Sequence, residues 1–426
     1  MRLSQSSSCI KNHTNSLKSS KLIGPLFGLM GLSLGLTSPF GWALEAGITE
    51  TSIRVGAHLP LEGDRKANGL ALKQGIEAAL ANQSVRGLRL EYLTINDFYQ
   101  PDKAVEAAKQ LIEKGVFLIL GSYGTPTVKA TLPLLAEKKV PVVAPYSGAA
   151  FSGPGDVLNL RASTANEVES VVNTALAAGL KPGEVCAYVQ NDAFGVSGLV
   201  GLRSALAKHT GAQELVTKLD PILAMSGDRP ARNGLGPVGV YERDSTNARD
   251  GYNSLKKWET DSGSRCRLAV TTAVYDAAVS FMAYARSKDE KWIFSSTSTA
   301  AGNRLQTLLK EKNVTDRVLS TEVMPSLNAS LPIVAEARKA LGLDLNPVSL
   351  EGYIDGKFLL AVLQATETPL TRENFLKAAR RQPYDLGGVK IDFTTDNQGY
   401  DYVGFLLLKD AQFAPASAQE IAALFK

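Results

Sequence analysis

The chain has 426 residues, of which 44% are hydrophobic and 21% are charged, and its formal net charge is +4. This balance is that of an ordinary soluble globular protein, and the length suffices for two domains or one large one. The charge is slight for this length and no face-like run of Lys and Arg occurs, which argues against nucleic acid as a partner.

Residues 1–43 have the pattern of a secretory signal peptide. Four basic residues lie at or before Lys21, Leu22–Leu36 is apolar, and Gly41-Trp42-Ala43 offers small residues for cleavage. A membrane anchor is the alternative, but the apolar run is shorter than the roughly 20 residues that a spanning helix needs. Cys9 precedes the apolar run, so it cannot become a lipidated first residue. We expect an exported, unanchored protein in the periplasm.

The first part of the mature chain alternates short apolar runs with helical patterns. Strands are expected at Ile53–Ala57, Leu88–Thr94, Val116–Leu120 and Val140–Val143, and helices at Gly69–Ala81, Pro101–Lys114 and Pro126–Lys138. This alternation predicts an α/β fold with a parallel sheet and helices on both of its faces.

The alternation restarts after Asn159–Ser163. Helices are expected at Ala165–Ala178, Phe194–Lys208 and Tyr275–Arg286, and strands at Val185–Val189, Glu214–Leu219, Leu268–Thr272 and Trp292–Phe294. Two such units in tandem predict two doubly wound lobes with a cleft between them. Ligands of open α/β sheets bind beyond the carboxyl ends of the strands, so both sheets would direct those ends at the cleft.

Two cysteines, Cys186 and Cys266, remain after cleavage at the predicted site. Each lies at or just before the start of a predicted strand, so the sulfurs could meet if those strands are parallel neighbours. Export makes a disulfide chemically feasible. A disulfide and a pair of buried free thiols both stay open.

The segment Asp220–Asn253 interrupts the alternation and reads as a long surface excursion. Within it, Gly234-Leu-Gly-Pro-Val-Gly239 matches the spacing of a dinucleotide-binding loop. The match includes Pro and opens no helix, so it lacks the context that such a loop requires. We therefore expect no nucleotide and no other cofactor.

The last part of the chain is mainly helical and ends in two strand-like runs. A strand is expected at Val318–Thr321, helices at Pro332–Leu341, Leu350–Thr366 and Thr371–Arg381, and final strands at Val389–Phe393 and Tyr402–Leu408. Those final runs fit edge strands added to a sheet that began earlier.

Residues for catalysis are scarce. His58 ends the first strand without an obvious partner, and His209 reads as a solvated side chain, so neither a histidine triad nor a metal site is expected. Gly195-Val-Ser-Gly-Leu199 lacks the last glycine of a nucleophile elbow. Asp97 and Asp192 are interpreted as capping or ion-paired groups. The chain is not expected to be an enzyme, and an exported hydrolase is the weakest alternative.

The stretch Leu118–Thr127 raises three alternatives: a phosphate loop, a nucleophile turn or a pocket for another small ligand. No GxxxxGK[ST] motif occurs and no base accompanies its hydroxyls. The residues instead predict a buried strand, a turn at Gly121–Gly124 that faces the cleft, and a helix that Thr125 and Pro126 open. We therefore expect a ligand pocket.

An ordered set of motifs resembles the type I periplasmic binding proteins of the branched-chain amino-acid (leucine/isoleucine/valine) class. The motifs are Ile48–Gly56, Pro60–Gly63, Gly69, Gly75, Asn96–Pro101, Gly121–Thr127, Val140–Gly148, Asn191–Gly195, Tyr241–Asp244, Val274–Ala278 and Ser349–Tyr353. The resemblance covers essentially the whole mature chain in order.

This resemblance implies two α/β lobes joined by a three-strand hinge. Lobe I would comprise residues 44–162 and 322–383, and lobe II residues 163–321 and 384–426. The crossings would lie near Leu160–Ser163, Ser320–Met324 and Tyr384–Gly387. Such proteins are monomers that deliver a ligand to an ABC permease, and relatives serve as sensing subunits of membrane receptors. Transport is the leading interpretation and sensing the alternative.

The resemblance also implies the ligand-binding residues. In family members, lobe I holds the ligand's carboxylate and ammonium with groups in two loops, and a further lobe I position is often aromatic. Lobe II would cover the ligand with two aromatic rings. The residues are Ser122, Tyr123, Gly124, Thr125, Tyr146, Ser147, Gly148, Asn68, Phe194 and Tyr275. Backbone N–H groups at a helix N-terminus together with hydroxyls suit a carboxylate.

One departure concerns the ligand's ammonium. Amino-acid binders of the class carry an acidic residue after the strand that matches Trp292–Phe294, whereas this chain has Ser295-Ser-Thr-Ser-Thr299. A buried ammonium without an anion is costly. We expect a small polar or carboxylate-bearing ligand, an amino acid or an analogue, and the departure favours one that is not a standard α-amino acid.

Overall fold

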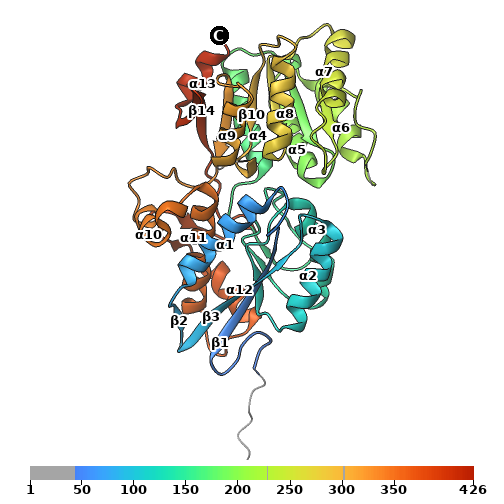
Figure 1. Cartoon of the computed structure of the whole chain (residues 1–426). Helices are drawn as coiled ribbons and strands as arrows, with labels where there is room; N and C mark the ends of the chain where they lie inside the picture. The colour runs from blue at the N-terminus through green and yellow to red at the C-terminus, as the bar shows by residue number, and fades with distance from the viewer. Residues whose placement is uncertain (1–43, 228, 301–302) are drawn as a thin grey trace, which may run out of the picture. The chain divides into compact units, whose positions relative to one another are not determined.

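The computed structural model describes residues 44–227, 229–300 and 303–426. The predicted signal peptide, residues 1–43, lies outside the described residues. Leu44–Lys426 form one compact unit, which contains two large β-sheets with helices packed against them (Figure 1). Among the described helices, none combines the length and the apolar character that crossing a membrane requires.

The first large sheet has six strands. Their order is β2 (Ser84–Val85), β3 (Leu88–Asn96), β1 (Ser52–Leu59), β4 (Leu118–Leu120), β5 (Val142–Val143) and β6 (Val157–Leu158). All pairings are parallel except that of the edge strand β2 with β3. The central strand β1 is buried over almost its whole length, which explains its largely apolar sequence.

Helices cover both faces of this sheet. The helices are α1 (Lys66–Leu80), α2 (Pro101–Glu113), α3 (Thr125–Glu137), α10 (Pro332–Leu341), α11 (Pro347–Ala365) and α12 (Arg372–Arg381). Leu72 of α1 shares an apolar cluster with Val55, whereas Leu111 of α2 shares a second cluster with Ile119. Helices α1 and α11 approach closely because Gly75 has no side chain: a Cβ there would lie 2.1 Å from the Ser349 carbonyl oxygen.

The second large sheet has seven strands. Their order is β15 (Gln412–Pro415), β14 (Gly404–Lys409), β11 (Val318–Glu322), β10 (Ile293–Ser296), β9 (Leu268–Thr272), β7 (Val185–Gln190) and β8 (Val238–Tyr241). The strands from β11 to β8 are parallel, and β14 and β15 continue the sheet in antiparallel pairings. This arrangement confirms the α/β fold and the expectation that Tyr402–Leu408 is a strand added late to an earlier sheet.

Side chains that the sequence displays cap some of the helices that accompany the second sheet. The helices are α4 (Thr164–Ala177), α5 (Ala193–Ala207), α6 (Gln213–Ala224), α7 (Arg249–Ser262), α8 (Tyr275–Arg286), α9 (Asn303–Glu311) and α13 (Ala418–Leu424). The Ser163 hydroxyl accepts from Asn166 N at the start of α4, and Asp192 accepts from Phe194 N at the start of α5. The capping role of Asp192 is thereby confirmed.

Two sequence predictions in the middle of the chain were wrong. Glu214–Leu219 is helical and lies within α6, because the buried residues Leu215, Val216, Leu219 and Ile222 repeat with the period of a helix. The segment Asp220–Asn253 is not one long excursion, since it contains the end of α6, strand β8 and the start of α7. The four-residue strand β8 pairs with β7, although the Gly and Pro residues before it mask its signal.

The predicted strand Val389–Phe393 forms a separate hairpin. Among the described strands, β13 (Lys390–Ile391) pairs with β12 (Tyr384–Asp385) alone, so it does not extend either large sheet. The rings of Tyr384 and Phe393 both contact Phe358 of α11. The hairpin therefore packs on a helix that accompanies the six-stranded sheet.

Candidate ligand-binding site

Two loops at the carboxyl ends of β4 and β5 meet through their backbones. Tyr123 and Tyr146 form an isolated parallel bridge, and Gly124 N donates to Tyr146 O at 3.0 Å. Gly124 has φ +97°, and a Cβ there would lie 2.5 Å from the Tyr99 ring, so the turn requires glycine. The geometry places the first residues of α3 beside the loop that follows β5.

Hydroxyl groups and tyrosine rings line this junction. The Thr125 and Ser147 hydroxyls share a hydrogen bond of 2.7 Å. The Tyr123 and Tyr146 rings stack with their centroids 5.1 Å apart, and Tyr99 meets Tyr123 edge-on at 5.8 Å. Burial raises the pKa of Tyr123 to about 12 and that of Tyr99 and Tyr146 further still, so these phenols stay neutral at physiological pH.

A small cavity lies between these loops and three residues that accompany the second sheet. We call it the cleft cavity, and its lining is Tyr99, Tyr123, Gly124, Thr125, Tyr146, Ser147, Phe194, Val274 and Thr299. The space within it that is open to the centres of water molecules is about 20 Å³. That volume holds only one or two waters, so a larger ligand requires the two walls to move apart.

Six of the ten predicted binding residues line the cleft cavity. These are Tyr123, Gly124, Thr125, Tyr146, Ser147 and Phe194. Asn68 lies next to it, since its amide donates to the Tyr123 hydroxyl at 3.4 Å and to Thr299 O at 3.5 Å. Tyr275 also lies outside the lining, and its hydroxyl donates to Asp64 O.

The remaining two predicted residues lie behind the cavity wall. Ser122 is fully buried and its hydroxyl accepts from His58 N at 3.1 Å. Gly148 packs against Thr164, whose hydroxyl oxygen would lie 1.9 Å from a Cβ at that position. Both residues therefore support the loops instead of lining the cavity.

Three lining residues, Tyr99, Val274 and Thr299, were missed as site residues. Tyr99 and Val274 fall within the motifs Asn96–Pro101 and Val274–Ala278 that carry the family resemblance, so a signal for them was present. Tyr99 has φ +60°, a backbone conformation that side chains rarely adopt, and this turn directs it towards Tyr123. Nothing in the sequence indicated that Thr299 would line the site, apart from the lack of a carboxylate in Ser295–Thr299.

A buried pair behind the site holds the Tyr99 turn. His58 Nδ1 lies 2.8 Å from an Asp97 carboxylate oxygen, and both side chains are fully buried. The other Asp97 oxygen accepts from Tyr99 N at 2.8 Å. The expectation that His58 lacks a partner was wrong, because Asp97, 39 residues further along the chain and just after the neighbouring strand β3, contacts it. The interpretation of Asp97 as a paired group is confirmed.

Contacts between residues of the two halves of the sequence surround the cleft cavity. Arg65 forms an ion pair with Asp276 of α8 at 2.8 Å, and its guanidinium lies 4.9 Å from the Tyr275 ring centre. Gln190 donates to the Tyr99 hydroxyl at 3.3 Å. These contacts join residues up to 211 positions apart in the chain.

A buried cluster of ionisable groups lies beside Tyr146. The Arg161 guanidinium is 4.5 Å from the Tyr146 ring centre and 3.4 Å from Glu351 of α11. Burial raises the pKa of Glu351 to about 7, a rise that Arg161 opposes and Glu167 reinforces. Glu167 also accepts from Ser298 N at 2.7 Å. The Arg161 guanidinium thus packs over the ring of a residue that lines the cleft cavity.

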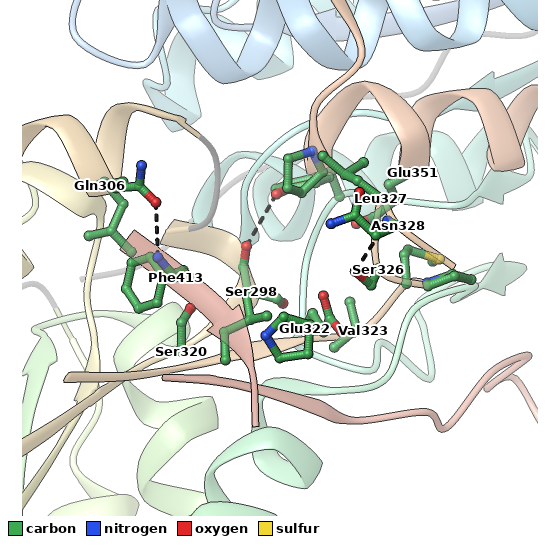
Figure 2. Close-up of a pocket in the computed structure, with 17 residues that line it drawn as sticks. Ser298, Gln306, Ser320, Glu322, Val323, Ser326, Leu327, Asn328, Glu351 and Phe413 are labelled. Atoms are coloured by element: carbon green, nitrogen blue, oxygen red, sulfur yellow. Dashed lines mark hydrogen bonds between the residues drawn. The ribbon is translucent and has the colours of Figure 1, made fainter. Parts of the chain in front are cut away.

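A larger cavity, which we call the hinge cavity, adjoins the site where β11 leaves the second sheet (Figure 2). The space within the hinge cavity that is open to the centres of water molecules is about 200 Å³. Tyr146 lines both cavities, whereas Ser298 lines the hinge cavity and its neighbour Thr299 lines the cleft cavity. The other lining residues are Leu305, Gln306, Ser320, Glu322, Val323, Met324, Pro325, Ser326, Leu327, Asn328, Pro347, Glu351, Leu406, Phe413 and Pro415.

The geometry of the cleft cavity suits binding. The Ser147 hydroxyl pairs with Thr125, and His209 is exposed with its Nδ1 beside a backbone carbonyl, so neither forms a nucleophile–base pair. Within the described ranges, no group of three or more His, Cys, Asp or Glu side chains could hold a metal ion. Neutral hydroxyl donors beside the start of α3 instead favour a carboxylate or another polar group.

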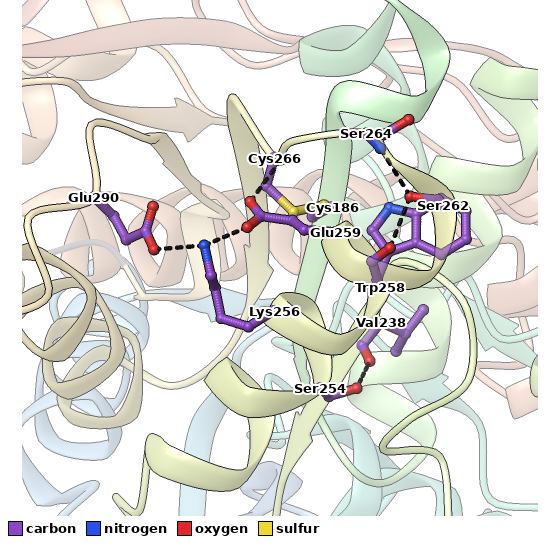
Figure 3. The surroundings of a disulfide bond; sticks show 10 residues. All are labelled: Cys186, Val238, Ser254, Lys256, Trp258, Glu259, Ser262, Ser264, Cys266 and Glu290. Carbon is purple, nitrogen blue, oxygen red and sulfur yellow. Dashed lines mark hydrogen bonds and ion pairs between the residues drawn. A yellow bond between two sulfur atoms is a disulfide. The ribbon is translucent and has the colours of Figure 1, made fainter.

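A disulfide joins Cys186 and Cys266, with their Cα atoms 5.7 Å apart (Figure 3). Cys186 lies near the start of β7, and Cys266 lies two residues before β9. The two strands are parallel neighbours, as the pairing required. The bond lies at the amino ends of these strands, whereas Phe194 and Val274 follow their carboxyl ends.

Sequence comparison with known proteins matches part of the chain to binding proteins. Residues 52–221 match a family described as "Periplasmic binding protein". The Leu/Ile/Val-binding protein homolog 2 of Brucella abortus (strain 2308) is 29% identical over 103 residues, which are 23% of this chain. The match spans only 28% of that relative's own length.

Solved structures match over most of the chain. A "possible leucine/isoleucine/valine-binding protein" from Rhodopirellula baltica SH 1 has a TM-score of 0.74 at 23% identity, with 89% of this chain and 99% of that chain covered. A fatty acid ABC transporter substrate-binding protein from Thermomonospora curvata has a TM-score of 0.70 at 20% identity, with 90% and 97% covered. The chain is thus similar to periplasmic binding proteins, by fold over most of its length and by sequence over residues 52–221.

Proposed function

We propose that the protein is a periplasmic solute-binding protein that captures a small carboxylate-bearing or polar ligand and delivers it to an ABC permease. The observation that carries the proposal is the cleft cavity itself. Hydroxyls and a helix start from the β4 and β5 loops form one wall, and Phe194, Val274 and Thr299 form the other. Such a site binds a polar head on one side and covers it on the other.

Binding is proposed to close two lobes about a hinge. Lobe I would comprise residues 44–162 and 322–383, and lobe II residues 163–321 and 384–426. One of these bounds changes: the contacts of Tyr384 and Phe393 with Phe358 of α11 assign the hairpin to lobe I, so the last crossing would move from residue 384 to near Gln398, which forms a bridge with Asn159. A ligand that contacts both walls stabilises the closed form by its differential affinity for that form.

The ligand is proposed to bear a carboxylate without a paired ammonium. Among the described residues, no acidic side chain lines the cleft cavity, and the nearby Asp276 is already paired with Arg65. The solved structures with this fold include a possible leucine/isoleucine/valine-binding protein, a fatty acid ABC transporter substrate-binding protein and a solute binding protein in complex with 4-hydroxybenzoate, so the fold leaves the ligand open. The chemistry of the lining therefore decides, and it favours a simple carboxylate.

Titration calorimetry with two matched probes tests the proposal. We expect isovalerate to bind more tightly than leucine, because leucine adds an ammonium that the cavity leaves unpaired. Thr125→Val should weaken isovalerate binding about tenfold, the effect of losing one hydrogen bond to a charged group. Thr217→Val, an exposed substitution on α6, is the matched control. Tight leucine binding would reject the ligand class, and turnover of a substrate would reject a binding role.

A further inference from the structure

The hinge cavity is the larger of the two cavities that meet at Tyr146. Its space of about 200 Å³ exceeds the 20 Å³ of the cleft cavity tenfold. Its walls come from α9, the segment after β11, the start of α11, and the edge strands β14 and β15 (Figure 2). A cavity of this size beside a binding site is large enough to take a substantial part of a small molecule.

The lining of the hinge cavity is mostly apolar. Leu305, Leu327, Leu406 and Phe413 contribute side chains from four different segments. The ionisable lining residues besides Tyr146 are Glu322 and Glu351, and both are acids. A ligand carboxylate would therefore meet repulsion here, whereas an alkyl or aryl group would meet apolar side chains.

The linings of the two cavities share Tyr146. Its hydroxyl donates to Ser298 O at 3.5 Å, a long and therefore weak hydrogen bond. Tyr146 belongs to the loop after β5, whereas Ser298 follows β10 of the other sheet. Separation of the two sheets would break this contact and join the cavities.

We propose that the hinge cavity is a second subsite, which takes the uncharged apolar body of a monocarboxylate whose head group is held in the cleft cavity. The inference rests on the proposed function and adds the shape of the ligand. The head lies at Thr125 and Ser147, and the body passes Tyr146 towards Leu327 and Phe413. The ligand class is thus an elongated amphipathic acid.

Calorimetry with straight-chain carboxylates from butyrate to decanoate tests this subsite in the full mature chain. Each methylene that enters the cavity should tighten binding roughly fourfold, the effect of burying one CH₂. Leu327→Trp shrinks the cavity and should abolish this gain for the long probes while butyrate binding stays unchanged. Leu406→Ala enlarges it and should extend the gain to longer chains. Leu343→Trp, at a fully exposed position, is the matched control.

The outcomes separate the subsite from the proposed function. A Leu327→Trp variant with wild-type affinity for every chain length overturns the subsite and leaves the binding function intact. Equal affinity of the wild-type protein for butyrate and decanoate also overturns the subsite without affecting the proposed binding function. If the wild-type protein binds leucine but no carboxylate of the series, the ligand class is wrong. If it binds no probe at all, both proposals fail. A circular dichroism melt shows whether each variant is folded.

Discussion

The two large sheets support the cleft cavity by different means. In the six-stranded sheet, the buried pair of His58 and Asp97 lies directly behind Tyr99, which lines the cavity. In the seven-stranded sheet, the Cys186–Cys266 bond lies at the amino ends of β7 and β9, away from Phe194 and Val274. Stability and site geometry are therefore coupled in the first sheet and separable in the second.

The largest expected effect concerns the buried pair. Asp97→Ala leaves two buried donors, His58 Nδ1 and Tyr99 N, without their acceptor. We expect a loss of about 3 to 5 kcal/mol of unfolding free energy, measured by urea denaturation. Ligand affinity should fall as well because the Tyr99 turn loosens. An Asp97→Ala variant that loses stability but keeps full ligand affinity would contradict the comparison, because stability and site geometry would then be separable in this sheet too.

The next effect concerns the disulfide of the seven-stranded sheet, where stability and site geometry are expected to be separable. Replacing Cys186 and Cys266 together by Ser opens a loop of 80 residues and should cost about 2 to 4 kcal/mol of unfolding free energy. Ligand affinity at 25 °C should stay within about twofold of wild type, because the bond is remote from the cavity. The wild-type protein in reducing buffer is the control. An affinity loss parallel to the stability loss would contradict the separation.

The third effect is the pH dependence of stability that arises from Glu351, the buried acid beside Arg161. Burial raises the pKa of Glu351 from 4.5 to about 7, so the protonated form is the one that the fold favours. The stabilisation it gives is complete below its ordinary pKa and is lost as the pH rises through about 7. Between about pH 5 and 8, the unfolding free energy of the wild-type protein, measured by urea denaturation, should fall by about 1 to 3 kcal/mol relative to that of Glu351→Gln. Parallel pH profiles of the two proteins would exclude this role.

The smallest effect concerns the ion pair that joins the two walls. Asp276→Asn removes the partner of Arg65, whose side chain is only 9% exposed. Affinity should fall about fivefold, or roughly 1 kcal/mol, because the closed form loses a contact that the open form lacks. Asp220→Asn, which breaks the exposed pair with Arg203, is the matched control and should leave affinity unchanged. Faster ligand release in stopped-flow measurements would locate the effect in the closed form.

Much of the fold could be predicted because its signals are local. Periodicity and strand–helix alternation placed β9, α8 and α10 at their observed bounds. The same logic failed at α6, where a short apolar run suits a strand as well as a helix. The edge strand β15 and the final helix α13 were not anticipated, because their side chains are largely exposed and carry a weak pattern.

The site was predictable where loops follow strands and unpredictable where distant segments meet. Thr125 and Ser147 follow neighbouring parallel strands, so their meeting could be expected from order alone. The direction of the Ser122 side chain depends on its contact with His58, 64 residues away. The hinge cavity depends on Tyr146 and Ser298, which are 152 residues apart. Only the assembled packing specifies such contacts.

The disulfide also bears on how the protein would respond to proteolysis. The linked interval contains residues 225–237, which lie between α6 and β8 and include several exposed positions. A protease that cuts once in this interval divides the backbone but not the covalent molecule, because Cys186 and Cys266 lie on opposite sides of the cut. The nicked protein would migrate as one band on a gel until a reductant separates its two fragments.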